Sequence, residues 1–381
     1  MADLLDYLDW RGDIPFSTDP FNYVDALILA ELAYVDFAGI VPGPENGDGA
    51  HPYVSIDTVA QEFWKRHTPE EIERSEVLFR RAPLLLKKLC SGVRFGGMYL
   101  AGYTNRISAQ KNEQMAALVF YLEDGSAYAA FRGTDDTVIG WKEDFSFSFR
   151  KETSGQTSAA QYLSEVFGKS DLQRIRVGGH SKGGNFSVYA SAFSDENVRS
   201  RISDIYTFDG PGLLEEVTAT REYREILPRV HSIVPEEALF GLLLDCGYYH
   251  KVVESSAKGI WQHDPLTWKV MRNRFVEAEG ISEGSLVLVR AVESWIREMS
   301  LEERREVVDL LFSLIEDSGY ENVSEIRADQ FLGIPELLRT YREMDTTEKE
   351  VLRNTVGNLL KSGVDSVSRE LLGRITRRKK E

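Results

Sequence analysis

Cysteine is nearly absent from this sequence. The two cysteines, Cys90 and Cys246, lie far apart and in no spacing typical of metal ligands. This scarcity excludes a fold built on a disulfide framework and argues against a zinc site. We find no glycine-rich phosphate-binding loop either, and we therefore expect the protein to use no cofactor and no metal ion.

Long hydrophobic runs are absent as well. No apolar stretch approaches the ~20 residues that a helix needs to cross a bilayer, so we expect no stable membrane insertion. The first ten residues contain three aspartates and no lysine or arginine, which is unlike a secretory signal peptide. Together these absences predict a soluble protein of the cytoplasm.

Positive charge is in the minority. The 381 residues include 45 Lys and Arg against 61 Asp and Glu, which gives a formal net charge of -16. An acidic protein repels nucleic-acid phosphates and anionic membrane surfaces, so we expect neither as a partner. Hydrophobic residues make up 42% of the chain, which is enough apolar material for a substantial core.

The sequence pattern changes twice along the chain. Residues 1–115 look mainly helical, and the chain is helical again from about residue 284. Between them, short β-prone runs are separated by helical stretches: 116–122, 127–131, 175–177, 205–208, 230–234 and 248–253. This alternation predicts an α/β fold with a mostly parallel, twisted sheet and flanking helices. We expect one such domain over residues 1–283 and a helical C-terminal extension over residues 284–381.

The C-terminal extension carries two capping-box patterns, Ser300 with Glu303 and Thr347 with Glu350. Its helices could pack on the core as an appendage. They could also serve as an interaction element that joins copies of the chain into a homo-oligomer. The sequence leaves both interpretations open.

A glycine-flanked serine follows the β-prone run at 175–177. Residues 179–183 read Gly-His-Ser-Lys-Gly, and a helical pattern follows them. In a Gly-x-Ser-x-Gly elbow, the turn from strand to helix is so sharp that only very small residues fit beside the serine, which is held out for attack. The context predicts that Ser181 is a nucleophile and that the backbone N–H of Lys182 binds a developing oxyanion. A structural elbow without catalytic partners is the alternative.

A second segment resembles a pattern of class 3 lipases. Residues 131–134 read Phe-Arg-Gly-Thr, and residues 141–144 read Trp-Lys-Glu-Asp. In that family, Phe-Arg-Gly-Ser/Thr precedes Trp-x-x-Asp, its Ser or Thr supplies an oxyanion donor, and the Asp holds that hydroxyl. The resemblance implies these roles for Thr134 and Asp144. An ordinary ion pair between Arg132 and Asp144 is the alternative.

Further motifs resemble the Mbeg1-like family, a relative of class 3 lipases found mainly in Gram-positive bacteria. They are Leu5-Asp6-Tyr7, Trp10-Arg11-Gly12-Asp13, Asn22-x-x-Asp25-Ala26-Leu27, Phe131-Arg132-Gly133-Thr134-Asp135-Asp136, the Gly-His-Ser-Lys-Gly-Gly-Asn run at 179–185, Phe208-Asp209-Gly210-Pro211-Gly212 and Gln262-His263-Asp264-Pro265. The resemblance covers the chain from its start to about residue 270. It implies an α/β-hydrolase-like fold and an esterase-type site without a settled substrate.

A nucleophilic serine needs a base, and six histidines compete for that role. His263 follows the last β-prone run, where the base of an α/β-hydrolase belongs, and we predict that it is the base. His250 is the runner-up. His180 lies inside the elbow, and we expect its side chain to point away from Ser181.

The third catalytic residue is an acid that orients the base, and the sequence offers several candidates for it. Class 3 lipases place an Asp after the strand that here ends near Pro235, but this chain has no Asp there. Since Glu can also serve as the acid, we predict Glu237, with Glu236 and Asp209 as alternatives.

The sequence as a whole predicts a serine hydrolase that cleaves a small acyl ester or lipid-like substrate through an acyl-enzyme. A non-catalytic, partner-binding scaffold on the same fold is one alternative. An acyltransferase is the other, because the same catalytic residues could pass the acyl group to an acceptor other than water.

Overall fold

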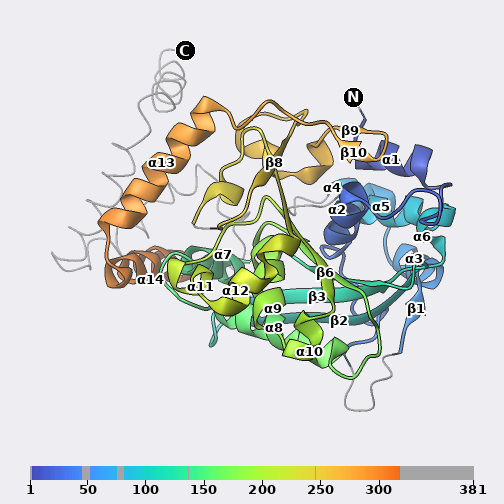
Figure 1. Cartoon of the computed structure of the whole chain (residues 1–381), viewed down its shortest axis with the longest axis horizontal. Coiled ribbons are helices and arrows are strands. Elements are labelled where there is room, and N and C mark those ends of the chain that lie inside the picture. The colour runs from blue at the N-terminus through green and yellow to red at the C-terminus, as the bar shows by residue number, and fades with distance from the viewer. Residues whose placement is uncertain (1, 45–51, 75–80, 136, 245, 318–381) are drawn as a thin grey trace.

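The computed structural model describes residues 2–44, 52–74, 81–135, 137–244 and 246–317. Over these residues an eight-stranded sheet forms the centre of the molecule, with its strands side by side in chain order (Figure 1). The strands are β1 (Val54–Ser55), β2 (Tyr99–Ser108), β3 (Glu113–Tyr121), β4 (Ala127–Phe131), β5 (Ile175–His180), β6 (Ile202–Phe208), β7 (Val230–Pro235) and β8 (His250–Val253). Strands β4 to β8 run parallel, and β1 to β4 pair antiparallel.

Helices cover both faces of this sheet. In β3, Leu118 and Phe120 join one hydrophobic core while Ala117 and Val119 join the other, as the two-residue period of a strand dictates. The first core is closed by the N-terminal helices, in blue in Figure 1, and the second by α8, α9 and α12, in green. The predicted fold class, an α/β-hydrolase-like sheet between helices, is therefore confirmed.

The helices divide into an N-terminal and a later set. The N-terminal set is α1 (Leu4–Arg11), α2 (Tyr23–Leu32), α3 (Ile56–Trp64), α4 (Pro69–Arg74), α5 (Ala82–Leu89) and α6 (Val93–Gly96). The later set is α7 (Val138–Ser146), α8 (Ser154–Phe167), α9 (Lys182–Phe193), α10 (Glu196–Arg199), α11 (Glu215–Thr218), α12 (Arg221–Ile226), α13 (Glu283–Glu298) and α14 (Leu301–Asp317). No helix in the described parts of the chain is both long and apolar enough to span a bilayer.

Short elements complete the domain after β6. They are the 3-10 helices η1 (Leu227–Arg229), η2 (Phe240–Leu242), η3 (Gly259–His263) and η4 (Pro265–Thr267), and the hairpin of β9 (Val270–Met271) and β10 (Arg274–Phe275). Because parallel strands end at the same edge of a sheet, the segments after β5, β6 and β7 lie at one edge. The candidate site lies at this edge.

The expectation that residues 1–115 are mainly helical is partly wrong. Strand β2 lies within this range, and β3 begins at Glu113. The pairing of β2 with β3 shifts register between Ala101 and Thr104, so the strand carries no unbroken alternation that the sequence could reveal. Each of the six predicted β-prone runs does contribute to a strand of the sheet, β3 to β8.

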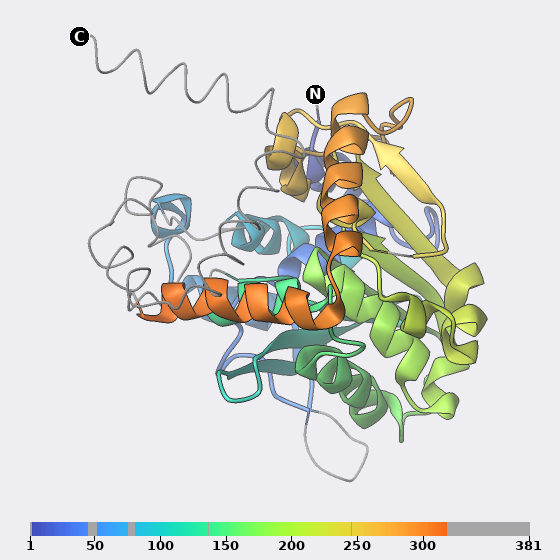
Figure 2. The same cartoon turned by 90° about the vertical axis from the view of Figure 1, so that its left-hand side faces the viewer.

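Two C-terminal helices follow the sheet. Figure 2 shows α13 and α14, in orange, running in different directions along the same side of the molecule. The predicted capping box is present at Ser300, whose hydroxyl accepts the Glu303 N–H at 3.2 Å. Val308 and Phe312 of α14 pack with Val138 of α7. Residues 318–381, with the Thr347 pattern, lie outside the described residues, so the extension and its part in homo-oligomer formation stay predictions.

A buried ion pair ties the first two helices to the segment before β2. The side chains of Asp25 and Arg94 are fully buried, and Arg94 Nε donates to Asp25 Oδ1 at 2.8 Å. The same oxygen accepts the Tyr7 hydroxyl at 2.8 Å, and Asn22 N–H donates to Oδ2 at 2.9 Å. Asp25 thus gathers donors from three segments, which gives the motif at residues 22–27 a structural role.

We predict that Asp25→Ala lowers the free energy of unfolding by about 3–5 kcal/mol, because it leaves the Arg94 guanidinium buried without its partner. Urea denaturation measures the change. The matched control is Asp9→Ala, which removes the carboxylate of the surface pair with Lys88 and should cost about 1 kcal/mol or less. Equal losses in the two variants would contradict the role of Asp25.

Candidate active site

Ser181 lies at the turn between β5 and α9. Its backbone has φ 57° and ψ -129°, a conformation that residues with a side chain rarely adopt. The turn is held by the Ser181 N–H, which donates to the Phe208 carbonyl oxygen of the neighbouring strand at 2.9 Å. This geometry lifts the serine hydroxyl out of the sheet edge, where other side chains can reach it.

The two flanking glycines are required by close backbone contacts. A Cβ atom on Gly179 would lie 2.4 Å from the Gly183 carbonyl carbon and oxygen, and one on Gly183 would lie 2.1 Å from the Phe131 oxygen. These neighbours are backbone atoms of strand and helix, which cannot move aside without disrupting the sheet. The Gly-x-Ser-x-Gly spacing is therefore a direct consequence of how tightly β5, α9 and the end of β4 meet.

His263 ends η3 and reaches back to the serine. Its Nε2 atom lies 3.0 Å from Ser181 Oγ. The ring packs against Phe240 of η2, with 4.4 Å between centroids, and against the His180 ring at 4.6 Å. The histidine predicted as the base is thus within hydrogen-bonding distance of the predicted nucleophile, and its ring is held on two sides.

Asp209 completes a hydrogen-bonded chain through His263. Its Oδ2 atom lies 2.6 Å from His263 Nδ1, and its Oδ1 accepts the Gly241 N–H at 2.9 Å. The side chain is buried, and the residue directly follows β6 with a positive φ of 48°. Asp209, His263 and Ser181 therefore lie in the order acid, imidazole and hydroxyl, an arrangement that can deprotonate the hydroxyl and stabilise the imidazolium that forms.

Glu237, the acid preferred from the sequence, does not occupy this position, and that prediction is wrong. Its Oε2 accepts the Gly259 N–H and, at 3.1 Å, the Gln262 side-chain amide. Its backbone N–H also donates to Gln262 Oε1 at 3.0 Å. Glu237 follows β7, one strand further from the nucleophile than Asp209, and it braces the η3 turn that carries His263.

The remaining acidic and imidazole candidates also lie elsewhere. Glu236 is held through its backbone, where its N–H donates to the Val253 oxygen at 3.0 Å. The His250 Nδ1 lies 2.8 Å from the Ser232 hydroxyl. Asp264 caps η4, where Oδ1 accepts the Leu266 N–H at 3.0 Å. Asp209, the alternative acid, is therefore the one that the structure brings to His263.

His180 points away from Ser181, as expected, and supports the base from behind. Its Nε2 lies 2.9 Å from the His263 carbonyl oxygen, and its Nδ1 lies 3.0 Å from the Tyr34 hydroxyl. Burial holds the pKa of His180 well below its ordinary value, so the ring is neutral. A neutral ring that donates from Nε2 must accept at Nδ1, and the Tyr34 hydroxyl is then the donor.

Thr134 and Asp144 form the hydrogen bond that the resemblance to class 3 lipases implied. The Thr134 hydroxyl donates to Asp144 Oδ2, while Arg132 pairs with Asp135 at 2.9 Å rather than with Asp144. Burial raises the pKa of Asp144 to about 6, against the opposing influence of the Lys182 ammonium and the Thr134 hydroxyl. The ion pair considered as an alternative for Asp144 is therefore not the contact that forms.

The second predicted oxyanion donor, the backbone N–H of Lys182, lies at the start of α9. Lys182 is the first residue of that helix, so its backbone N–H has no acceptor within the helix. A Cβ atom placed on Gly133, next to Thr134, would lie 3.1 Å from Ser181 Cβ, which shows how closely the end of β4 approaches the elbow. Two donor segments thus flank the serine.

Sequence reasoning missed two contributors to this site. Tyr34 lies within residues 1–115, which the sequence predicted only as mainly helical, yet its hydroxyl reaches His180. The side chain of Lys182 was not considered, yet it is buried beside Glu143 and Asp144. A lysine directly inside a glycine-flanked elbow was the available signal, because most positions around it are apolar or very small.

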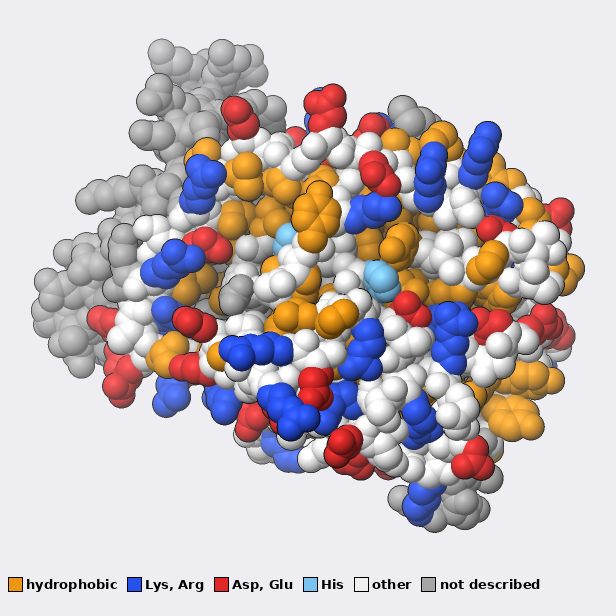
Figure 3. All heavy atoms as spheres, in the orientation of Figure 1, with side chains coloured by type: hydrophobic (Ala, Val, Ile, Leu, Met, Phe, Trp, Pro, Cys, Tyr) orange, Lys and Arg blue, Asp and Glu red, His pale blue; other side chains and the backbone are white. Residues whose placement is uncertain are grey.

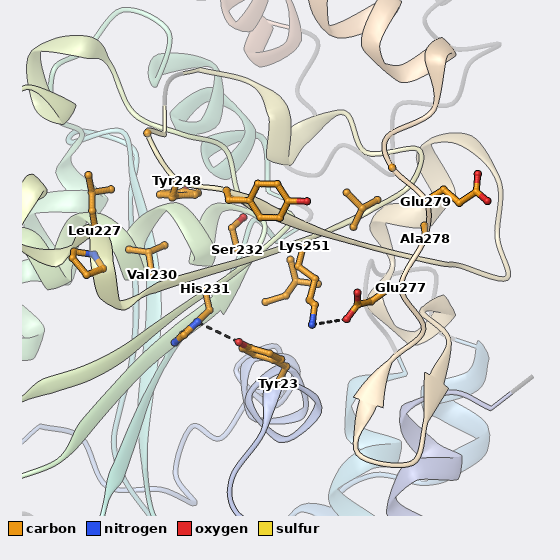
Figure 4. A pocket seen from close by; sticks show the side chains of 16 residues that line it. Tyr23, Leu227, Val230, His231, Ser232, Tyr248, Lys251, Glu277, Ala278 and Glu279 are labelled. Carbon is orange, nitrogen blue, oxygen red and sulfur yellow. Dashed lines mark hydrogen bonds and ion pairs between the residues drawn. The ribbon is translucent and has the colours of Figure 1, made fainter.

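A cavity of about 650 Å³ lies apart from these residues (Figure 4). It is lined by β7 and β8, by the segments that precede these strands and by residues 277–280, and it includes Tyr23, His231 and Lys251. Two of its lining residues, Lys251 and Glu277, form an ion pair at 2.8 Å. Among the described residues, no group of three or more His, Cys, Asp and Glu side chains is arranged to bind a metal ion.

Comparison with known proteins assigns the family. The sequence profile of the Mbeg1-like family matches residues 89–313, which is more than half of the chain. The chain belongs to the Mbeg1-like family. The match includes every residue of the site described above except Tyr34, while the motifs at residues 5–13 and 22–27 precede it. The resemblance predicted from the sequence is thereby confirmed.

Other comparisons add little to this assignment. A search of curated proteins gave no match to this Mbeg1-like chain. Among solved structures, the crystal structure of M37 lipase is similar, with 17% sequence identity and a TM-score of 0.33. The similarity covers 45% of the Mbeg1-like chain and 65% of the lipase chain.

We predict that Ser181→Gly is more stable than Ser181→Ala by about 1 kcal/mol. A strained positive φ costs about 1–3 kcal/mol, glycine relieves that strain, and its greater freedom in the unfolded chain offsets part of the gain. Alanine keeps the Cβ atom and therefore the strain, so it is the matched control. Denaturant midpoints measure the difference, and a more stable alanine variant would contradict strain at Ser181.

Proposed function

We propose that this protein is a serine hydrolase that cleaves acyl esters through an acyl-enzyme intermediate. The observation that carries the proposal is the continuous chain of hydrogen bonds from Asp209 through His263 to Ser181, at 2.6 and 3.0 Å. Each of these groups lies within hydrogen-bonding distance of the next, which is the first requirement of general acid–base catalysis.

In the acylation step, Ser181 Oγ attacks the carbonyl carbon of the ester while His263 Nε2 takes the hydroxyl proton. Asp209 stabilises the imidazolium through Nδ1. The backbone N–H of Lys182 and the donors of Thr134 bind the oxyanion of the tetrahedral intermediate. The intermediate then breaks its bond to the alcohol oxygen, which leaves with the proton that His263 returns.

In the deacylation step, His263 takes a proton from water as the water oxygen attacks the acyl-enzyme. The second tetrahedral intermediate is held by the same donors. Its collapse breaks the bond to Ser181 Oγ, which regains its proton from His263, and the acid product leaves. An alcohol in place of water would give acyl transfer by the same steps.

The surroundings of His263 favour an apolar acyl group. Ile260 and Trp261 in η3 are 57% and 74% exposed, and Phe240 packs on the His263 ring. Figure 3 shows hydrophobic side chains gathered across the middle of the face it presents, with charged side chains around them. We therefore propose a small acyl ester or lipid-like ester as the substrate.

A fluorophosphonate probe tests this function directly. The wild-type protein should be labelled at Ser181, as located by mass spectrometry, and should hydrolyse p-nitrophenyl esters. Ser181→Ala should lose both properties with an unchanged circular dichroism spectrum. Equal labelling of the variant, or no labelling of the folded wild type, would contradict the proposal and favour a non-catalytic scaffold. Addition of a primary alcohol to the assay distinguishes transfer from hydrolysis by the ester it yields.

The choice between the two acids gives a second test. Asp209→Asn should lower kcat on the order of 10³- to 10⁴-fold, because His263 loses its preferred tautomer and its charged partner. Glu237→Gln is the matched control and should cause a much smaller loss, since it alters only the support of η3. Steady-state kinetics on a short-chain ester measures both, and the reverse order would restore Glu237 as the acid.

A further inference from the structure

The nucleophile elbow contains a buried cation. The Lys182 side chain is fully buried, and its Nζ atom lies 3.5 Å from Glu143 Oε2 and 3.6 Å from Asp144 Oδ1. It also donates to the Gly140 carbonyl oxygen at 3.3 Å. Burial of an ammonium group costs free energy unless the group is paired. Lys182 therefore has a specific role in the site, unlike a lysine on the surface.

The two carboxyl groups around Lys182 have different partners. Glu143 accepts backbone N–H groups on both oxygens, from Gln114 at 2.9 Å and from Gly155 at 2.7 Å, and so anchors α7 to β3 and α8. Asp144 instead uses Oδ2 to hold the Thr134 hydroxyl and turns Oδ1 toward the ammonium. Asp144 Oδ1 is buried and has no hydrogen-bond partner within standard distance. The Lys182 ammonium, 3.6 Å away, therefore offsets the cost of burying this charged oxygen.

We propose that the Lys182 side chain is a positioning residue for the oxyanion donor Thr134 and acts on it through Asp144. The inference rests on the serine hydrolase function proposed above. The ammonium fixes the orientation of the Asp144 carboxyl group, and that group fixes the Thr134 hydroxyl. One residue then serves the oxyanion twice, directly through its backbone N–H and indirectly through its side chain.

The proton of the Thr134 hydroxyl connects this cluster to catalysis. The ionised Asp144 accepts the hydrogen bond of the Thr134 hydroxyl, so this contact fixes the conformation of residue 134 and leaves its backbone N–H to bind the oxyanion. Protonation of Asp144 removes that acceptor and loosens the donor. Burial raises the pKa of Asp144, Lys182 from α9 lowers it, and the neighbouring Glu143 of α7 raises it. Tyr34, after α2, is the further titratable group coupled to Asp144.

The test replaces Lys182 by methionine, which keeps the length of the side chain and removes its charge. We expect kcat to fall about 10- to 100-fold with KM changed less than about twofold, because a misaligned donor weakens only the transition state. The rate of fluorophosphonate labelling should fall by a similar factor. Lys87→Met, on the exposed side of α5, is the matched control and should match the wild type.

A pH profile separates positioning from a merely structural role. Asp144→Asn should remove one limb of the kcat profile, which identifies the limb that follows Asp144. In Lys182→Met the same limb should move to higher pH, because the ammonium that lowers the pKa of Asp144 is gone. A limb that stays in place, or labelling and kcat equal to those of Lys87→Met, would overturn the proposal.

A double variant keeps the proposal falsifiable if Lys182→Met does not fold. Lys182→Met with Asp144→Asn removes both charges, and its kcat should equal that of Asp144→Asn alone, because the two residues act in series. Multiplied losses would contradict the proposal, and failure of both variants to fold would replace it by a structural role. Absence of Ser181 labelling in the wild type would refute the hydrolase function itself, which is a separate outcome.

Discussion

The backbone strain at Ser181 is the constraint on which the site depends. The residue keeps a positive φ because β5, α9 and the end of β4 meet so closely that glycines must flank it. The same close approach brings Gly133 and therefore Thr134 beside the serine, and the first N–H of α9 directly follows the serine. The sheet order then sets which carboxylate reaches His263, because β6 is the next strand and Asp209 directly follows it.

Support for the base comes from outside this turn. Glu237 fastens the η3 segment, and His180 holds the His263 carbonyl group while Tyr34 holds His180. These contacts come from β5, η3 and the segments that follow α2 and β7, so the position of one imidazole depends on segments far apart in the chain. In this Mbeg1-like protein the candidate site thus lies at the sheet edge, and Tyr34, after α2, supports it through His180.

Much of this could be predicted from the sequence because its signals are local. The elbow, the β-prone runs and the late His263 each follow from residues next to one another in the chain. The acid could not be chosen that way, since Asp209 and Glu237 both follow strands and only packing decides which one reaches the imidazole. Strand β2 was hidden by its irregular register. The place of Lys182 in the elbow was a signal, but the sequence alone does not show which carboxylates lie beside its ammonium.

The most direct measurement is a crystal structure of the protein after reaction with a phosphonate ester, whose phosphorus stands in for the tetrahedral carbon. The account predicts a bond from phosphorus to Ser181 Oγ and a phosphoryl oxygen within hydrogen-bonding distance of the Lys182 N–H and of Thr134. His263 should keep its hydrogen bond to Asp209. An adduct on another residue, or a phosphoryl oxygen directed away from both donors, would contradict it.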